Sequence, residues 1–327
     1  MQFRTELNVL PSAHPITHSS RLLLVGSCFA EEIGQKLLDN KFEVLVNPFG
    51  TIFNPLSLFE LLEKSFTGGQ LPSLVVEREG RFFHYGLHSC HSAPTAQAME
   101  QLAQALLRHT AEWIDRPPKN DARIIITLGT AWIYELAQTG IPVANCHKMP
   151  AHLFNKRLLK VEEIVSAFDN LFNRLPSYCR IIVTVSPVRH LKDTLPLNAV
   201  SKSVLRLAAH QICQDFPGVE YFPAYELLLD DLRDYRFYAK DLLHPSEEAV
   251  EYIFEKFATA YFSAQTMQLI QRWEKIRQAL QHRPLQPYSL SHGQFLEQLL
   301  EQLRKIAPYL PVSQELAFVE EQLKRCS

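Results

Sequence analysis

The chain carries Leu22-Leu23-Leu24-Val25-Gly26-Ser27-Cys28-Phe29-Ala30, an apolar run that leads through a small turn into a helical pattern. Two similar apolar runs follow, at 124–128 and 181–185. Short continuous apolar runs are typical of strands buried on both faces of a parallel sheet. The sequence therefore predicts a three-layer α/β/α fold with a doubly wound parallel sheet. Helices are predicted at 29–40, 56–65, 96–114, 161–174 and 201–215.

The alternation of strands and helices is interrupted once and then ends. Residues 68–94 combine paired glycines with alternating apolar residues, which predicts a small β excursion or flap. After about residue 265 only amphipathic helical patterns remain, separated by prolines. We therefore expect an α/β domain over residues 1–265 and a helical C-terminal extension over 266–327. The apolar positions of the extension are expected to cover a core rather than to bind a partner.

Composition narrows the classes of function. The chain has 327 residues, of which 46% are hydrophobic and 21% charged, as expected for a globular protein. Its 33 Lys and Arg residues against 35 Asp and Glu give a net charge of -2, so a nucleic-acid partner is not expected. No apolar run is long enough for a membrane span. Six scattered cysteines without a disulfide spacing, and no secretory pattern, favour the cytoplasm; export after removal of a signal is the alternative.

A candidate nucleophile follows the first predicted strand. Ligands of doubly wound sheets bind outside the carboxyl ends of the strands, here Gly26-Ser27, Gly129-Thr130 and Ser186-Pro187. At Ser27 the backbone N–H groups of the next helix can stabilise an oxyanion. Serine is also a favoured N-cap residue, and this segment alone leaves both interpretations open. Cys28, the alternative nucleophile, is expected to point inward as a small hydrophobe.

A candidate base comes late in the chain, in Asp241-Leu242-Leu243-His244-Pro245. An Asp and a His three residues apart on a loop can meet, so that the carboxylate accepts one ring N–H and leaves the other ring nitrogen free. Alone, this pair is also compatible with a chance pairing at a helix entrance. Together with Ser27 it predicts a Ser–His–Asp triad.

Several segments resemble the GSCFA family. Gly26-Ser27-Cys28-Phe29-Ala30 spells the pentapeptide of its name, and other matching segments occur in order over roughly residues 1–260. These are Asn47-Pro48-Phe49-Gly50-Thr51-Ile52-Phe53-Asn54-Pro55, Asn145-Cys146-His147-Lys148, Ser186-Pro187-Val188 and the Asp241–Pro245 segment.

That family resembles a branch of the SGNH (GDSL-like) hydrolases, which are esterases with a flavodoxin-like three-layer fold. The resemblance implies Ser27 as nucleophile, His244 as base, Asp241 as its orienter and Gly50 as an oxyanion N–H donor, without a metal or an organic cofactor.

The chain departs from the SGNH pattern at the oxyanion donor. SGNH enzymes have an asparagine in a G-x-N-D block, whereas the matching strand end here is Gly129-Thr130-Ala131-Trp132. Loss of one such donor typically costs about two to three orders of magnitude in rate. The replacement is expected from Thr130, from Asn54 or, as first choice, from Asn145, with a local turn role as the alternative for Asn145.

Other polar residues are candidates for metal or substrate binding. The spacing of the histidines and cysteines does not repeat a structural zinc pattern, so no metal site is expected. His147 is interpreted as a substrate-binding or supporting residue. Arg189 and His190 are expected to contact an anionic substrate or to lie on a solvated loop. The histidines and cysteines concerned are His84, His88, Cys90, His91, Cys146 and His147.

The expected function is hydrolysis of a carboxylic ester, such as an acyl group on a small molecule or a glycan, through an acyl-Ser27 intermediate. One alternative is a carbohydrate-binding module that keeps the fold without catalysis. The other is an acyltransferase that uses the same triad.

Overall fold

A computed structural model describes residues 4–116, 121–282 and 289–326. The chain forms two compact units. The first unit contains Arg21–Gln35, Val44–Phe257 and the N-terminal residues up to Val9. The second contains Leu10–Ser20, Lys36–Glu43 and the residues from Ala258 onward.

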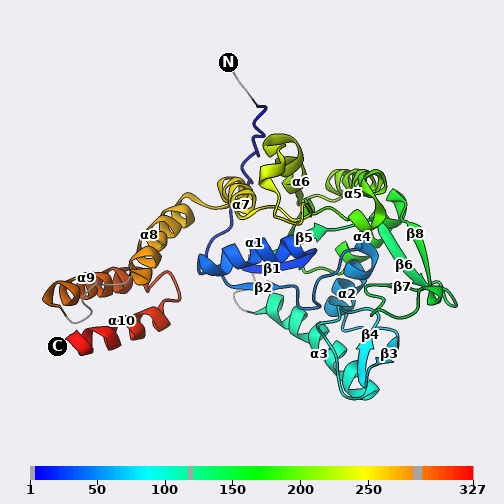
Figure 1. Cartoon of the computed structure of the whole chain (residues 1–327), viewed down its shortest axis with the longest axis horizontal. Coiled ribbons are helices and arrows are strands. Elements are labelled where there is room, and N and C mark those ends of the chain that lie inside the picture. Colours follow the sequence, from blue (N-terminus) through cyan, green and yellow to red (C-terminus); the bar gives the residue numbers. More distant parts are fainter. Residues whose placement is uncertain (1–3, 117–120, 283–288, 327) are drawn as a thin grey trace. The chain divides into compact units, whose positions relative to one another are not determined.

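The first unit is built on a five-stranded parallel sheet (Figure 1). The three apolar runs predicted as strands are neighbours in it, as β1, β5 and β9. The order β10-β9-β5-β1-β2 is that of flavodoxin-like doubly wound sheets, whose direction of winding reverses between β1 and β5. The strands are β1 (Arg21–Gly26), β2 (Val44–Val46), β5 (Ala122–Leu128), β9 (Cys179–Val185) and β10 (Val219–Phe222).

Helices cover both faces of this sheet, which confirms the three-layer α/β/α prediction. Side chains such as Leu23, Ile124 and Val183 form one buried cluster with helices α2, α3, α4 and α5. On the other face, α1 packs so closely that a Cβ on its Gly34 would lie 2.5 Å from a methyl group of Val46. The main helices are α1 (Cys28–Asp39), α2 (Pro55–Thr67), α3 (Ala96–Asp115), α4 (Val161–Phe172), α5 (Leu195–Asp215) and α7 (Glu247–Tyr261).

Helix α7 completes the second face through its C-terminal half. The ring of its Phe257 meets the ring of Phe222 of β10 edge to face, with 5.2 Å between the centroids. Three short helical segments precede it: α6 (Ala224–Glu226), a π-helix at Leu227–Leu232 and a 3₁₀ turn at Tyr235–Phe237. These segments carry the chain from β10 to the loop that contains Asp241 and His244.

Two small antiparallel sheets are inserted in the first unit. The hairpin of β3 (Val75–Arg78) and β4 (Arg81–His84) confirms the β excursion expected within 68–94. The second sheet, with the order β7-β6-β8, was not predicted. It contains β6 (Trp132–Leu136), β7 (Pro142–Val143) and β8 (Phe154–Leu158), and 3₁₀ turns lie at Ala151–Leu153 and Leu191–Asp193.

The second unit contains the helices α8 (Ala264–Gln281), α9 (Leu290–Ile306) and α10 (Ser313–Cys326). Leu296, Leu299, Leu300 and Leu303 are buried in the core that these helices share, together with Trp273. Earlier segments of the chain join this unit, because Trp273 Nε1 donates a hydrogen bond to Asp39 O at 2.7 Å. The division of the chain into domains at residue 265 stays a prediction. No helix of the described residues is long and apolar enough to cross a membrane.

Candidate active site

Ser27 lies between β1 and α1, beside the position where the sheet reverses its winding. Gly26 precedes it with a φ of +129°, and a Cβ there would lie 2.0 Å from Thr127 O, so the turn requires glycine. Ser27 N–H donates to Thr127 O at 3.1 Å. Its Oγ accepts a hydrogen bond from Phe29 N–H at 3.3 Å, and the residue is fully buried. Ser27 therefore follows the carboxyl end of a core strand and also caps α1.

Cys28, the first residue of α1, is less buried than Ser27. Its expected orientation toward the interior stays a prediction. Burial disfavours the thiolate and the charge of Glu31 repels it, so the pKa of Cys28 is raised above its ordinary value. Cys28 is therefore protonated at neutral pH and is a weak nucleophile.

Asp241 and His244 form the pair expected from their spacing. Asp241 Oδ2 lies 2.6 Å from His244 Nδ1, and both side chains are 46% exposed. Asp241 Oδ1 accepts the N–H groups of Leu243 and His244 at 2.9 and 3.1 Å. The Leu243 N–H, followed by the contacts with His244, lowers the pKa of Asp241 to about 2. The carboxylate is thus ionised at neutral pH and orients the imidazole.

The loop that carries this pair is fixed to the segment that follows β9. Arg189 N–H donates to Leu243 O at 3.1 Å, and the Arg189 guanidinium lies 3.9 Å from the ring centroid of Tyr238. Leu242 adopts a φ of +60°, a conformation that is unfavourable for a branched side chain. Backbone strain of this kind is common at functional sites.

His190 lies on the segment that follows β9, beside the Asp241–His244 pair. Burial of its imidazole, and then the nearby charge of Lys202, lower the pKa of His190 to about 4. His190 is therefore neutral at physiological pH.

Among the described residues, no hydrogen bond joins His244 to Ser27, although both belong to the carboxyl-end side of the sheet.

Lys202 is a charged residue at this edge of the sheet that sequence reasoning missed. It is 1% exposed, and its Nζ donates to Gly129 O and Ser186 O, each at 2.7 Å. The ammonium group therefore ties together the chain segments that leave β5 and β9. Burial lowers its pKa to about 7. The sequence contained a signal, because Lys202 lies three residues before the buried Leu205 on the apolar face of α5.

The expected oxyanion donors near the strand ends have local partners in this structure. Gly50 has a φ of +73°, and its N–H donates to Asn47 O at 2.7 Å. Thr130 Oγ1 shares a hydrogen bond with Ser201 Oγ at 3.0 Å and accepts Trp132 N–H at 3.1 Å.

Cys28 N–H belongs to the first turn of α1, whose N–H groups have no intrahelical acceptors. It is thus the main-chain donor next to Ser27.

The two asparagines and His147 also have local roles. Asn54 is the N-cap of α2, where its Oδ1 accepts Ser57 N–H at 2.9 Å. Asn145 Oδ1 accepts the N–H of His147 at 2.8 Å, which is the turn role considered as the alternative. His147 is 1% exposed and holds the chain near β4, since its Nε2 lies 2.9 Å from His84 O. The substrate roles of these three residues stay predictions.

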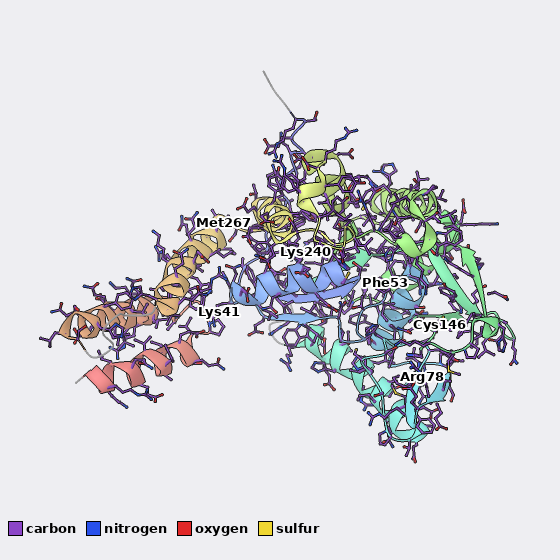
Figure 2. The ribbon with its side chains drawn as sticks, viewed as in Figure 1. Lys41, Phe53, Arg78, Cys146, Lys240 and Met267 are labelled. Atoms are coloured by element: carbon purple, nitrogen blue, oxygen red, sulfur yellow. The ribbon has the colours of Figure 1, made fainter. Side chains whose placement is uncertain are left out.

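A cavity of about 490 Å³ lies beside the strand ends. Thr130, which follows β5, and His190, which follows β9, line it, as do Asn54 and Asn145. Figure 2 labels two further lining residues, Phe53 and Cys146. Ser27 and His244 are not among the lining residues, and His190 connects the cavity wall with the surroundings of His244.

His84, His88 and His147 lie close enough to influence one another electrostatically. Within the described ranges, no group of three or more His, Cys, Asp or Glu side chains is placed to hold a metal ion. His84 Nε2 instead lies 3.0 Å from Pro72 O, and His147 Nδ1 lies 2.9 Å from Ser89 Oγ. These two histidines fix loops.

Comparison with family models gives two matches. The model described as GSCFA family matches residues 21–257, and the model described as GSCFA domain protein, C-terminal domain, matches residues 273–325. No curated protein matches the chain. The first match spans well over half of the sequence and includes Ser27, Asp241 and His244. The chain therefore belongs to the GSCFA family.

Proposed function

We propose that this protein is an acyl-ester hydrolase of the SGNH type that cleaves a carboxylic ester through an acyl-Ser27 intermediate. The observation that carries the proposal is the contact of 2.6 Å between Asp241 Oδ2 and His244 Nδ1. This contact places the ring proton on Nδ1 and leaves Nε2 free to act as a base. The pair is held against the segment after β9, and Ser27 follows β1 in the same parallel sheet.

In the proposed reaction, His244 Nε2 takes the proton of Ser27 Oγ as Oγ attacks the ester carbonyl. The negative charge of the tetrahedral intermediate is stabilised by the first-turn N–H of Cys28 at the positive end of α1. His244 then gives its proton to the leaving alcohol, and the acyl-serine forms. Water attacks this ester with His244 again as base, which releases the acid and restores Ser27.

The proposal requires two local rearrangements. Ser27 Oγ accepts the hydrogen bond from Phe29 N–H and must in addition donate its own hydrogen to His244 Nε2, a contact that the described residues do not make. Because Ser27 is fully buried, the segments above it must also move enough to admit the substrate. Hydrogen bonds of catalytic groups commonly tighten only in the substrate complex.

A fluorophosphonate probe tests the nucleophile directly. We expect it to label Ser27 in the wild-type protein and in Cys28→Ala, and not in Ser27→Ala or His244→Ala, as read by peptide mass spectrometry. The same variants are assayed with 4-nitrophenyl acetate, first in water and then with an added alcohol as acceptor. Transfer of the acyl group to the alcohol in preference to water identifies an acyltransferase. Labelling at Cys28 in a folded protein contradicts the serine mechanism.

The second candidate function is a binding module without catalysis. The complete burial of Ser27 and its role as the cap of α1 favour this alternative. A module of this kind stays unlabelled by the probe when folded and hydrolyses no activated ester. Both measurements are therefore made with thermal unfolding of the same sample as a control.

A further inference from the structure

The cavity beside the strand ends has a charge opposite in sign to that of the whole chain. Three lysines line it, Lys148, Lys156 and Lys192, whereas Asp193 is its one lining carboxylate. The chain as a whole has a net charge of -2. Since His190 is neutral at physiological pH, the lining has a local excess of two positive charges.

Two of the three lysines are available to a ligand. Lys156 forms an ion pair with Asp193, and its Nζ lies 5.1 Å from the ring centroid of Trp132. Lys148 and Lys192 make no ion pair with any residue that the structure describes, and both are exposed. Lys192 lies near the Cys146 thiol, where its charge opposes the effect of burial on the pKa of that group.

Lys148 is held toward the cavity by a strained turn. His147 and Lys148 have φ angles of +50° and +58°, and two successive residues other than glycine rarely adopt this conformation. The turn is fixed on its buried side, because the His147 ring is bonded to Ser89 Oγ and to His84 O and stacks on Phe83. Strain of this kind persists only where the surroundings over-determine it, and it is common at ligand clamps.

The inner wall of the cavity is apolar. Val143 and Phe154 are 2% and 9% exposed, and both line it together with Phe53. A ligand that fills such a cavity places a ring or another apolar group against this wall and its charged group at the lysines. Thr130 and His190, which follow the core strands β5 and β9, also line the cavity.

We propose that this cavity binds the alcohol portion of the ester, and that this portion is an apolar or cyclic group carrying an anion, which Lys148 and Lys192 bind. The inference rests on the proposed esterase function for the identity of the ligand as an ester. Either a carboxylate or a phosphate group carries the negative charge that these lysines would bind.

Binding of alcohol analogues tests the site without turnover. The probes are 4-hydroxybenzoate, phenyl phosphate and methyl 4-hydroxybenzoate, titrated into the full chain by calorimetry. We expect at least one anion to bind about tenfold more tightly than the neutral methyl ester, a preference that decreases as salt increases. The preference is expected to disappear in the double variant Lys148→Gln/Lys192→Gln. It should persist in Lys275→Gln/Lys324→Gln, which removes two lysines that do not line the cavity.

Hydrolysis separates this inference from the proposed function. The substrates are 4-acetoxybenzoate and its methyl ester, compared by kcat/KM in the same variants. A lysine-dependent preference in binding without cleavage of either ester supports an anion site and contradicts the esterase proposal. Cleavage of both esters at equal rates, with no preference in binding, supports the esterase and overturns the inference. A preference that survives in Lys148→Gln/Lys192→Gln also overturns it.

Discussion

The carboxylate of Asp241 fixes both the ring and the backbone of His244. One oxygen lies 2.6 Å from His244 Nδ1, and the other accepts the main-chain N–H of the same residue at 3.1 Å. The Asp-x-x-His turn therefore positions its histidine through two independent contacts, before any substrate is bound.

Asp241→Asn is expected to lower kcat by about 10⁴ while the protein stays folded. The amide NH₂ of asparagine would donate to Nδ1 and place the ring proton on Nε2, where the base must be free. The measurement is kcat on 4-nitrophenyl acetate with circular dichroism of each variant. Asp234→Asn is the matched control, since Asp234 also accepts a hydrogen bond in a local turn, from Arg236 N–H at 3.0 Å. Full activity of Asp241→Asn would rule out the orienting role.

Lys202 is expected to make stability depend on pH in the alkaline range. Its pKa of about 7 in the folded protein is lower than the value near 10.4 of an unfolded lysine. Between these values the unfolded state binds the additional proton, so the free energy of unfolding rises with pH, by at most about 1.4 kcal/mol per pH unit. Urea unfolding at pH 7, 8 and 9 should show this rise relative to Lys202→Met. Parallel curves for the two proteins would contradict the prediction.

Gly26→Ala is expected to destabilise the protein by about 4 kcal/mol or more. The new Cβ would lie 2.0 Å from the main-chain Thr127 O, which cannot move without disrupting the pairing of β1 with β5. Gly80→Ala is the control: Gly80 also has a positive φ, of +73°, but apart from its own atoms and its two chain neighbours nothing lies within 4 Å of the new Cβ. The control should lose only about 1 kcal/mol. Urea midpoints compare the two, and similar losses would disprove the steric argument.

His147→Asn is expected to remove a contribution to the free energy of unfolding that becomes smaller at acid pH. Burial lowers the pKa of His147 below its ordinary value, so the folded protein binds this proton less readily than the unfolded chain. The contribution of His147 is therefore fully present above about pH 6.5 and decreases as the pH falls below that value. Asparagine tolerates the positive φ of this position. Thermal unfolding at pH 7.5 and pH 5.5 should show a smaller difference between the two proteins at the lower pH. An unchanged difference would refute the prediction.

The core strands were predictable because they are buried on both faces. Residues 22–25, 124–128 and 181–185 are continuous apolar runs, which few other structures explain. The sheet of β6, β7 and β8 was missed because its strands are short and mix apolar with charged residues, as in Phe154–Leu158. Such strands are defined by pairing with distant partners, and local composition does not encode that pairing.

The Asp241–His244 contact was predictable because it is local, three residues apart in one turn. The surroundings of Asn145 and Lys202 were not. The Asn145 side chain accepts a hydrogen bond from the main-chain N–H of His147. No sequence pattern distinguishes an asparagine in such a turn from one whose amide is directed at a substrate. Lys202 meets Gly129 and Ser186 only after β5 and β9 have paired.

The second unit has a consequence for synthesis on the ribosome. A hydrogen bond in this unit joins Asp39 and Trp273, which are 234 residues apart in the sequence. An ion pair joins Lys41 and Glu315, which are 274 residues apart. At typical translation speeds, on the order of ten seconds or more pass between the synthesis of these early residues and the synthesis of their partners. During this interval Ile16 and Phe42 lack the apolar cover that they have in the folded unit, because Phe262 has not yet been synthesised. We expect nascent chains of intermediate length to be bound by chaperones that recognise exposed apolar segments.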